Sequence, residues 1–395
     1  MLRPISPAAV LREINNVGAH KSGENIMVKK SGILPFKITG LRTPGVNILK
    51  QEMLSCGGEC VTPMEAITCD KKYCDVVLLG TVQHYKWLCT KLEKMQYFGL
   101  GEVQKELQKF LNLSIAKTVL ASGKEIVYDH TVVMGVINIT PDSFFSASRV
   151  TDVDKIVEVA GKMLKDGAEI LDIGGESSRP GADAVTEEEE IKRVVPAIRA
   201  IKEKYPECII SIDTYHSKTA LSALEAGADI LNDITAGQAD DNMLRLAAEK
   251  NVPIILMHMR GNPKNMQSDT HYDNVVDEVT TYLLERAKIA EELGLGFDKV
   301  ILDPGIGFAK TTEDNLKLIQ DIAGLTKHGY PVLLAASRKT VIGDTLHEKS
   351  PEDRLEGTLA ISAQAVNSHV EIVRVHDVVE NTRVIRMLEA IKKCQ

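Results

Sequence analysis

From about residue 130 onward the chain repeats one pattern: a short β-branched apolar run, a polar or glycine-containing turn, and a stretch with apolar positions near a 3.6-residue period. Repeated βα units of this kind predict a parallel sheet. The eight predicted strands are residues 132–140, 170–176, 208–214, 230–235, 253–259, 300–305, 331–337 and 371–377. The predicted helices are residues 153–166, 187–204, 217–226, 241–250, 272–293, 313–322, 353–367 and 379–392. Eight such units close most naturally as a (β/α)8 barrel.

The first third of the chain differs in character. It holds five of the seven cysteines and the only tryptophan, Trp87. Between Leu111 and Asp129 the apolar runs shorten and the chain passes through Ala-Ser-Gly-Lys at residues 121–124, a composition that suits a domain junction. We therefore predict a smaller N-terminal α+β domain over residues 1–122, whose function the sequence does not reveal, followed by the barrel over residues 123–395.

Composition and charge narrow the class of protein. The chain has 395 residues, of which 44% are hydrophobic and 26% charged, as in ordinary globular proteins. A formal net charge of −8 gives no large positive field for a nucleic acid or an anionic membrane, so we expect neither as a partner. No signal peptide or membrane span is apparent, which indicates a cytoplasmic protein. Cys56 and Cys60 form a C-x3-C pair, which without a second close pair is more typical of ordinary reduced thiols than of a metal site.

Polar side chains concentrate at the carboxyl ends of the predicted strands, where barrel enzymes assemble their active sites. On the last strand, Arg374 and His376 stand two residues apart and therefore lie on the same side of an extended chain. Together with Asn138 on the first strand they could bind a diphosphate, since a guanidinium grips oxygens with two donors. The alternative is a structural pair between Arg374 and an aspartate.

A second cluster follows the seventh strand. Lys339 stands between the hydroxyls of Ser337 and Thr340 at the start of a helical turn, where free backbone N–H groups favour anions. This segment suits a carboxylate or a phosphate. A solvated basic turn is the alternative.

Three further strands end in acceptors and an amide. Asp213, Asn232 and Asp303 offer the combination that reads the N–H-rich edge of an aminopterin ring. Met257 and Phe308 could supply apolar walls for a flat ring. The alternatives are structural capping by the carboxylates and ordinary core packing by the two apolar residues.

In sequence order, these segments resemble the dihydropteroate synthase family of pterin-binding barrels over roughly residues 130 to 392. The resemblance rests on Met-Gly-Val-Ile-Asn-Ile-Thr-Pro-Asp-Ser-Phe at 134–144, Gly-Gly-Glu-Ser-Ser-Arg-Pro-Gly at 174–181, Ser-Ile-Asp-Thr at 211–214, Asn-Asp at 232–233, Leu-Met-His-Met-Arg-Gly-Asn-Pro at 256–263, Asp-Pro-Gly-Ile-Gly-Phe at 303–308, Ser-Arg-Lys at 337–339 and Arg-Val-His-Asp at 374–377. No single segment would suffice, but their order on successive strands is specific.

The resemblance implies that (7,8-dihydropterin-6-yl)methyl diphosphate loses diphosphate with the help of Mg²⁺, and that the amine of 4-aminobenzoate captures the pterin cation. It assigns diphosphate and metal to Asn138, Arg374 and His376, and the pterin to Asp213, Asn232, Asp303 and Lys339. It assigns the border of the aminobenzoate site to Ser178, Arg179 and Thr340. Within these sets, Lys339, Arg374, His376 and Asp213 would act in catalysis and Asn138 would hold the metal. It further implies a homodimer with small-molecule substrates and sensitivity to sulfonamides.

The sequence also departs from the family pattern. Phe-Ser-Ala-Ser at residues 145–148 replaces the usual Ser-Asp-Gly-Gly of the first loop, and Ala335 stands where glycine is common. Ser178 replaces the usual Thr and Thr340 replaces the usual Ser, so both positions keep a hydroxyl. The altered first loop and Ala335 leave open a pterin-binding module that has lost catalysis. A pterin-dependent methyltransferase is the other rival, because it would share the Asn and Asp contacts to the pterin.

Overall fold

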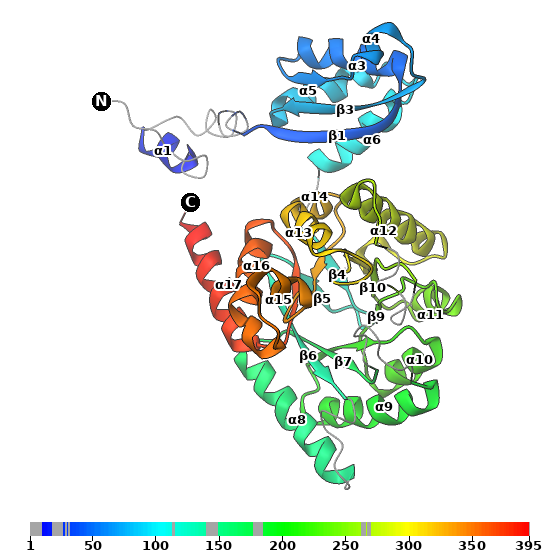
Figure 1. Cartoon of the computed structure of the whole chain (residues 1–395), viewed down its shortest axis with the longest axis vertical. Coiled ribbons are helices and arrows are strands. Elements are labelled where there is room, and N and C mark those ends of the chain that lie inside the picture. The colour runs from blue at the N-terminus through cyan, green and yellow to red at the C-terminus, as the bar shows by residue number, and fades with distance from the viewer. Residues whose placement is uncertain are drawn as a thin grey trace. The chain divides into compact units, whose positions relative to one another are not determined.

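The structure is a computed structural model that describes residues 10–17, 27, 30, 32–112, 115–139, 149–176, 185–261, 266 and 270–394. The chain divides into two compact units, and the second of them spans Ile115–Ile391 (Figure 1). Each unit is described by itself.

The N-terminal unit is a small α+β fold, as expected. Its antiparallel sheet has the order β1-β3-β2, formed by β1 (Leu34–Arg42), β3 (Tyr73–Gly80) and β2 (Glu59–Val61). The helices are α1 (Val10–Asn16), α3 (Thr43–Ser55), α4 (Glu65–Thr68), α5 (Val82–Leu92) and α6 (Leu100–Leu111). Buried side chains of α3, α5 and α6 form one core with those of β1 and β3. This core is separate from that of the second unit.

The second unit is the expected (β/α)8 barrel. Its parallel strands are β6 (Val132–Asn138), β7 (Ile170–Gly174), β8 (Ile209–Asp213), β9 (Ile230–Asp233), β10 (Ile254–Met257), β11 (Val300–Asp303), β12 (Leu333–Leu334) and β13 (Ile372–Val375). The six strands β6 to β11 lie side by side in chain order, and β13 pairs with both β12 and β6. A parallel bridge between Leu302 and Val332 joins β11 to the segment entering β12, which closes the ring.

Helices follow the strands and surround the barrel (Figure 1). They are α8 (Arg149–Asp166), α9 (Glu187–Lys204), α10 (Ser217–Ala226), α11 (Asn242–Lys250), α12 (Val275–Glu292), α13 (Thr312–Gln320), α14 (Ile322–Thr326), α15 (Thr340–Leu346), α16 (Leu355–Asn367) and α17 (Val378–Lys393). Local sequence sets several ends: the Thr186 hydroxyl accepts a hydrogen bond from the backbone N–H of Glu189 and begins α9. Four glutamates in the first turn of α9 favour the positive end of its dipole.

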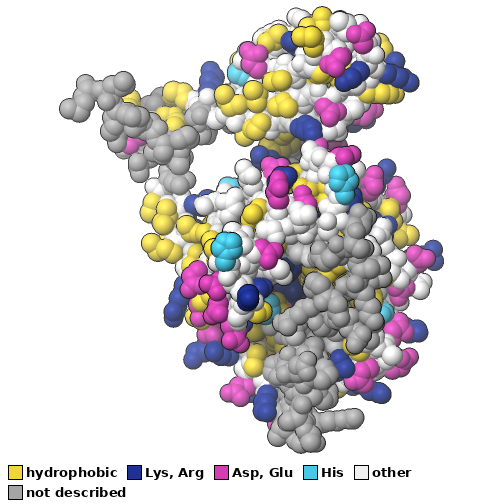
Figure 2. Space-filling view, in the orientation of Figure 1, with side chains coloured by type: hydrophobic (Ala, Val, Ile, Leu, Met, Phe, Trp, Pro, Cys, Tyr) yellow, Lys and Arg dark blue, Asp and Glu magenta, His cyan; other side chains and the backbone are white. Residues whose placement is uncertain are grey.

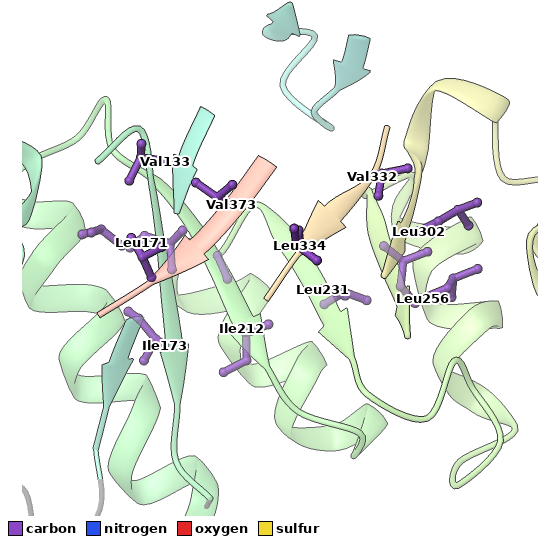
Figure 3. Close-up of a cluster of buried hydrophobic side chains, with 14 of the residues drawn as sticks. Val133, Leu171, Ile173, Ile212, Leu231, Leu256, Leu302, Val332, Leu334 and Val373 are labelled. Atoms are coloured by element: carbon purple, nitrogen blue, oxygen red, sulfur yellow. The ribbon is translucent and has the colours of Figure 1, made fainter. Parts of the chain in front are cut away.

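Strand side chains alternate between the helices and the barrel interior. Leu171, Ile212, Leu231, Leu256 and Val373 face outward into the large core between strands and helices (Figure 3). The neighbouring positions form a second core inside the barrel: Val132, Met134, Ile170, Ile230, Ile255, Ile301, Leu333 and Ile372. Burial on both faces explains why the strands appear in the sequence as nearly continuous apolar runs.

A short hairpin closes the amino-terminal end of the barrel. Its strands are β4 (Lys117–Val119) and β5 (Glu125–Val127), and its side chains Leu120, Ile126 and Tyr128 belong to the interior core. Lys299, just before β11, donates to the carbonyl of Val119. The junction expected near Gly123 therefore falls in the turn of a hairpin that packs with the barrel, and the compact barrel unit begins earlier, at Ile115.

Charges of both signs are present on the face of the molecule that Figure 2 shows. Lys, Arg, Asp and Glu side chains are intermixed on the visible face of the molecule (Figure 2). All seven cysteines are free thiols, five of them buried. A search of the described helices finds no segment with the length and apolar character that crossing a bilayer demands.

The hairpin gives a stability prediction with a matched control. Ile126 is 8% exposed and points into the barrel interior, whereas its neighbour Val127 is 45% exposed on the opposite face of β5. We expect Ile126→Ala to lower the free energy of unfolding by about 2–5 kcal/mol. Val127→Ala should change it by no more than about 0.5 kcal/mol. Chemical denaturation of the two variants measures this, and equal destabilisation would show that the hairpin is not part of the barrel core.

Candidate active site in the barrel mouth

The apolar interior of the barrel gives way to polar side chains near the carboxyl ends of the strands. Strand register explains which of them meet: Gly174 lies opposite Asp213, and Asp213 lies opposite Asn232. Asp172 lies opposite Ser211 on the same interior face. The interior positions of β7, β8 and β9 thus form one polar layer.

Arg374 is the centre of this layer. Its Nε donates to Asp172 Oδ2 at 2.6 Å, and its Nη2 donates to Asp213 Oδ2 at 2.6 Å. Asn232 Nδ2 donates to the same Asp172 oxygen at 3.2 Å. The structural alternative for Arg374 is therefore realised in the structure, because the guanidinium pairs with aspartates. Within the described part of the chain, its hydrogen bonds to side chains run from Nε and Nη2 and leave Nη1 unused.

Burial and charge perturb these groups in opposite directions. Burial raises the pKa of Asp213 to about 7, although Arg374 beside it acts to lower that pKa. Burial also acts to lower the pKa of Arg374, but the carboxylates of Asp172 and Asp213 outweigh it, and the net shift is upward. Asp172 Oδ1 and Ser211 Oγ are buried without a hydrogen-bond partner among the described residues. The layer therefore retains unused acceptor capacity.

Asp303 and Lys339 form the opposite wall. Asp303 Oδ1 accepts a hydrogen bond from the backbone N–H of Gly305 at 2.7 Å. Lys339 Nζ donates to the carbonyl of Ile306 at 2.6 Å and lies 4.7 Å from the ring centroid of Phe308. Burial lowers the pKa of Lys339 to about 8 and raises that of Asp303, while each charge opposes the shift of the other.

The two proposed apolar residues lie beside this wall. Met257 and Phe308 belong to a small buried cluster with Ile234, Met259, Met266 and Ala309, and Tyr215 packs against it. This cluster is separate from both large cores. A flat ring bound between Asp213 and Lys339 would therefore meet apolar side chains. Ala335, the methyl-bearing departure from the family pattern, is buried at 4% exposure.

Asn138 and His376 flank the polar layer. A Cβ added at Gly174 would lie 3.6 Å from Asn138 Oδ1 and 3.7 Å from Asp213 Oδ2. The amide oxygen of Asn138 therefore lies near Asp213 Oδ2, the oxygen that accepts from Arg374. His376 Nδ1 lies 3.1 Å from Ser337 Oγ, so the hydroxyl orients the imidazole.

The remaining predicted residues divide into two groups. Thr340 is exposed and begins α15 directly after Lys339. Ser178, Arg179 and the loop at residues 140–148 lie outside the described residues. Asp377, adjacent to His376, does not join the polar layer: its carboxylate pairs with Arg338.

Sequence reasoning missed two contributors. Asp172 is not among the predicted site residues, although its carboxylate accepts hydrogen bonds from both Arg374 and Asn232. Lys310 received no attention at all. Its buried Nζ contacts His258 Nδ1 at 3.0 Å and the carbonyls of Gly305 and Phe308 at 3.0 and 2.9 Å. Burial lowers its pKa to about 7, and Lys310 holds the segment that carries Asp303 and Phe308. A lone lysine ending a glycine-rich apolar segment was the available signal.

The ion pairs of Arg374 lead to a stability prediction. Arg374→Ala would leave Asp172 and Asp213 without their buried partner, which typically costs about 3–5 kcal/mol. Arg338→Ala breaks a pair whose arginine side chain is 32% exposed and should cost about 1 kcal/mol or less. Denaturant unfolding at pH 8, above the pKa of Asp213, compares them; a smaller loss for Arg374→Ala would refute the central role of this guanidinium.

Comparisons with known proteins agree with this geometry. The family model described as pterin binding enzyme matches residues 134–376. The chain is 44% identical over 264 residues to a dihydropteroate synthase of Clostridium beijerinckii, covering 67% of this chain and 95% of that relative. It is also 44% identical over 263 residues to a dihydropteroate synthase of Bacillus subtilis, covering 67% of this chain and 89% of that relative.

Solved structures give the same result. A Xanthomonas albilineans dihydropteroate synthase with 4-aminobenzoic acid aligns with a TM-score of 0.66 and 36% identity, covering 71% of this chain and 99% of that one. The same enzyme in complex with 7,8-dihydropteroate aligns with a TM-score of 0.63 and 34% identity, covering 70% of this chain and 98% of that one. This chain belongs to the dihydropteroate synthase family of pterin-binding enzymes.

Proposed function

We propose that the chain condenses (7,8-dihydropterin-6-yl)methyl diphosphate with 4-aminobenzoate to give 7,8-dihydropteroate and diphosphate. The observation that carries the proposal is the polar layer of Asp213, Asn232 and Arg374 facing Asp303 and Lys339 inside a closed barrel. Family membership supports the same reaction, as do the ligands of the two Xanthomonas structures.

The pterin would lie between the two walls of the mouth. Its ring N–H and amino groups are donors, and the carboxylates of Asp213 and Asp303 with the amide of Asn232 supply acceptors at three strand ends. The charged ammonium of Lys339 would donate a hydrogen bond to a ring heteroatom. Met257 and Phe308 would cover the apolar face of the ring. This arrangement holds the ring rigidly and spreads positive charge that develops on it.

The leaving group would lie near Arg374, His376 and Asn138. In the reaction the bond between the pterin methylene carbon and the diphosphate oxygen breaks, and its electron pair leaves with the diphosphate. The free Nη1 of Arg374 and the imidazole of His376 would donate to the leaving oxygens. The amide oxygen of Asn138 is the type of ligand that a hard cation takes, so Mg²⁺ would be held by Asn138 and would neutralise charge on the diphosphate.

4-Aminobenzoate would enter from the exposed side of the mouth. We assign its carboxylate to the region of Ser178, Arg179 and Thr340, on the strength of the family resemblance. Its amine nitrogen then forms a bond to the methylene carbon and releases a proton to solvent. Closure of the mouth against water would protect the reactive pterin from hydrolysis.

We also propose a cytoplasmic homodimer whose partners are small molecules rather than nucleic acids or membranes. Analytical ultracentrifugation of the purified chain tests the oligomeric state. The N-terminal unit has no assigned role in this reaction. We propose that it ends before Ile115, where the compact barrel unit begins, whereas the sequence alone indicates residues 1–122.

The reaction is tested with the purified full-length chain. Incubation with pterin diphosphate, 4-aminobenzoate and Mg²⁺ should release diphosphate and 7,8-dihydropteroate in equal amounts, and sulfonamides should raise the apparent KM for 4-aminobenzoate. Pterin binding without diphosphate release would instead identify an inactive binding module. Methyl transfer from a methylated pterin to a corrinoid protein, without dihydropteroate formation, would identify a methyltransferase.

The pKa of Lys339 gives a pH prediction. Because that pKa is lowered to about 8, the ammonium is charged at pH 7 and loses its proton as the pH rises to 9. The affinity for pterin diphosphate should therefore fall by up to about tenfold over this interval, because the charged fraction of Lys339 in the free protein falls about tenfold between pH 7 and pH 9.

The matched control is Lys339→Arg, whose guanidinium stays charged throughout this interval. Calorimetric titration of both proteins at pH 7, 8 and 9 separates the lysine from any titration of the ligand. The same decline in both proteins would rule out Lys339 as the titrating group.

A further inference from the structure

A second cluster of charged side chains lies at the carboxyl edge of the barrel, outside the candidate active site. It consists of Glu176 after β7, Glu190 in the first turns of α9, and His216 between β8 and α10. One ligand atom from each of the three side chains lies within 4.8 Å of the other two. In the described part of the chain this is the one group of three or more His, Cys, Asp or Glu side chains with such proximity. None of the three has a role in the proposed reaction.

The hydrogen bonds inside the cluster leave two oxygens unused. Glu190 is fully buried, and its Oε2 accepts from Thr214 Oγ1 and contacts His216 Nδ1, both at 3.0 Å. Glu176 Oε1 accepts from the hydroxyl of Tyr215 at 2.8 Å. The other oxygen of each carboxylate, Glu190 Oε1 and Glu176 Oε2, is buried without a hydrogen-bond partner in the described structure. Buried carboxylate oxygens are almost always satisfied, and this pair offers two acceptors to a positively charged ligand.

The backbone around the cluster is built to bring these groups together. A Cβ added at Gly175 would lie 2.9 Å from Cγ of Glu190 and 2.8 Å from Cγ1 of Val194, so only glycine lets α9 approach the end of β7 this closely. Arg193 Nη1 donates to the carbonyl of Gly175 at 2.9 Å and fixes the approach. The carboxylate of Glu190 is therefore held under the segment that carries Glu176.

We propose that Glu176, Glu190 and His216 bind a divalent transition-metal ion, with Zn²⁺ as the best match. Zn²⁺ accepts His nitrogen and Glu oxygen ligands at about 2.0–2.2 Å, which places tetrahedral ligand atoms roughly 3.4 Å apart. Side-chain atoms within 4.8 Å of each other reach this geometry by small rotations. Three protein ligands leave a fourth position for water. The ion would join the segments that follow β7 and β8 to α9, and would neutralise the two carboxylates.

The test uses full-length protein stripped of metal by a chelator, without substrates or diphosphate. Isothermal titration with ZnCl2 should show one bound equivalent in the wild type. The side chain of His216 is 22% exposed in the wild type. His216→Ala should weaken Zn²⁺ binding at least about tenfold, because even the loss of a residue that only orients a metal ligand usually costs this much. Glu176→Gln should have the same effect. Zn²⁺ should also raise the unfolding temperature of the wild type, but not of these variants.

Two controls distinguish this site from others. His271→Ala removes a histidine that is 89% exposed and should leave the bound equivalent intact. Asn138→Ala should leave it intact as well, because Asn138 belongs to the proposed Mg²⁺ and diphosphate site. Equal Zn²⁺ binding by the wild type, His216→Ala and Glu176→Gln would overturn the proposal, as would loss of binding in Asn138→Ala alone. Absence of Zn²⁺ binding by the wild type would overturn the proposal as well.

Discussion

The candidate active site depends on one buried cation. Arg374 lies inside the barrel at 15% side-chain exposure and is stable there only because Asp172 and Asp213 pair with it at 2.6 Å. Those carboxylates reach it because β13, β6, β7 and β8 are neighbours in the closed ring. The same pairs fix the orientation of Asp213, which in turn lies opposite Asn232. Barrel closure and the geometry of the polar layer are therefore one constraint, because neither Arg374 nor the aspartates could be buried alone.

The barrel interior separates stability from chemistry along its axis. At the amino-terminal end, the hairpin β4–β5 and the interior core form an apolar plug. At the carboxyl end, the interior positions two residues further along the strands become Asp172, Ser211, Asn232 and Arg374. The carboxyl end bears the electrostatic cost of buried charge, and the apolar plug supplies burial that offsets it. This division explains how the mouth tolerates an acceptor such as Asp172 Oδ1, which is buried without a hydrogen-bond partner among the described residues.

The fold was largely predictable, since strands buried on both faces appear as short continuous apolar runs and the helices show a period of 3.6 residues. The bounds predicted for α9 and α10 are those observed, and all eight strands were located. The turn-like composition near Gly123 marks the turn of the β4–β5 hairpin, but composition does not reveal which core the two strands join. The short helix α15 was expected only as a helical turn, because its seven residues are too few to show a clear period.

The predicted site residues are found at the barrel mouth wherever the structure describes them, but their partners were harder to foresee. Arg374 and Asp172 are 202 positions apart, whereas Asp377 lies close in sequence and pairs with Arg338 instead. Alternation along β13 accounts for Arg374, which shares the interior face with Ile372, whereas Asp377 follows the end of the strand. Once the strand ends and the closed ring are known, the alternation of side chains along each strand is enough to place four residues in one layer: Asp172, Asp213, Asn232 and Arg374. This alternation applies only within strands, so it could not predict the positions of Lys310 on a loop and Glu190 on a helix.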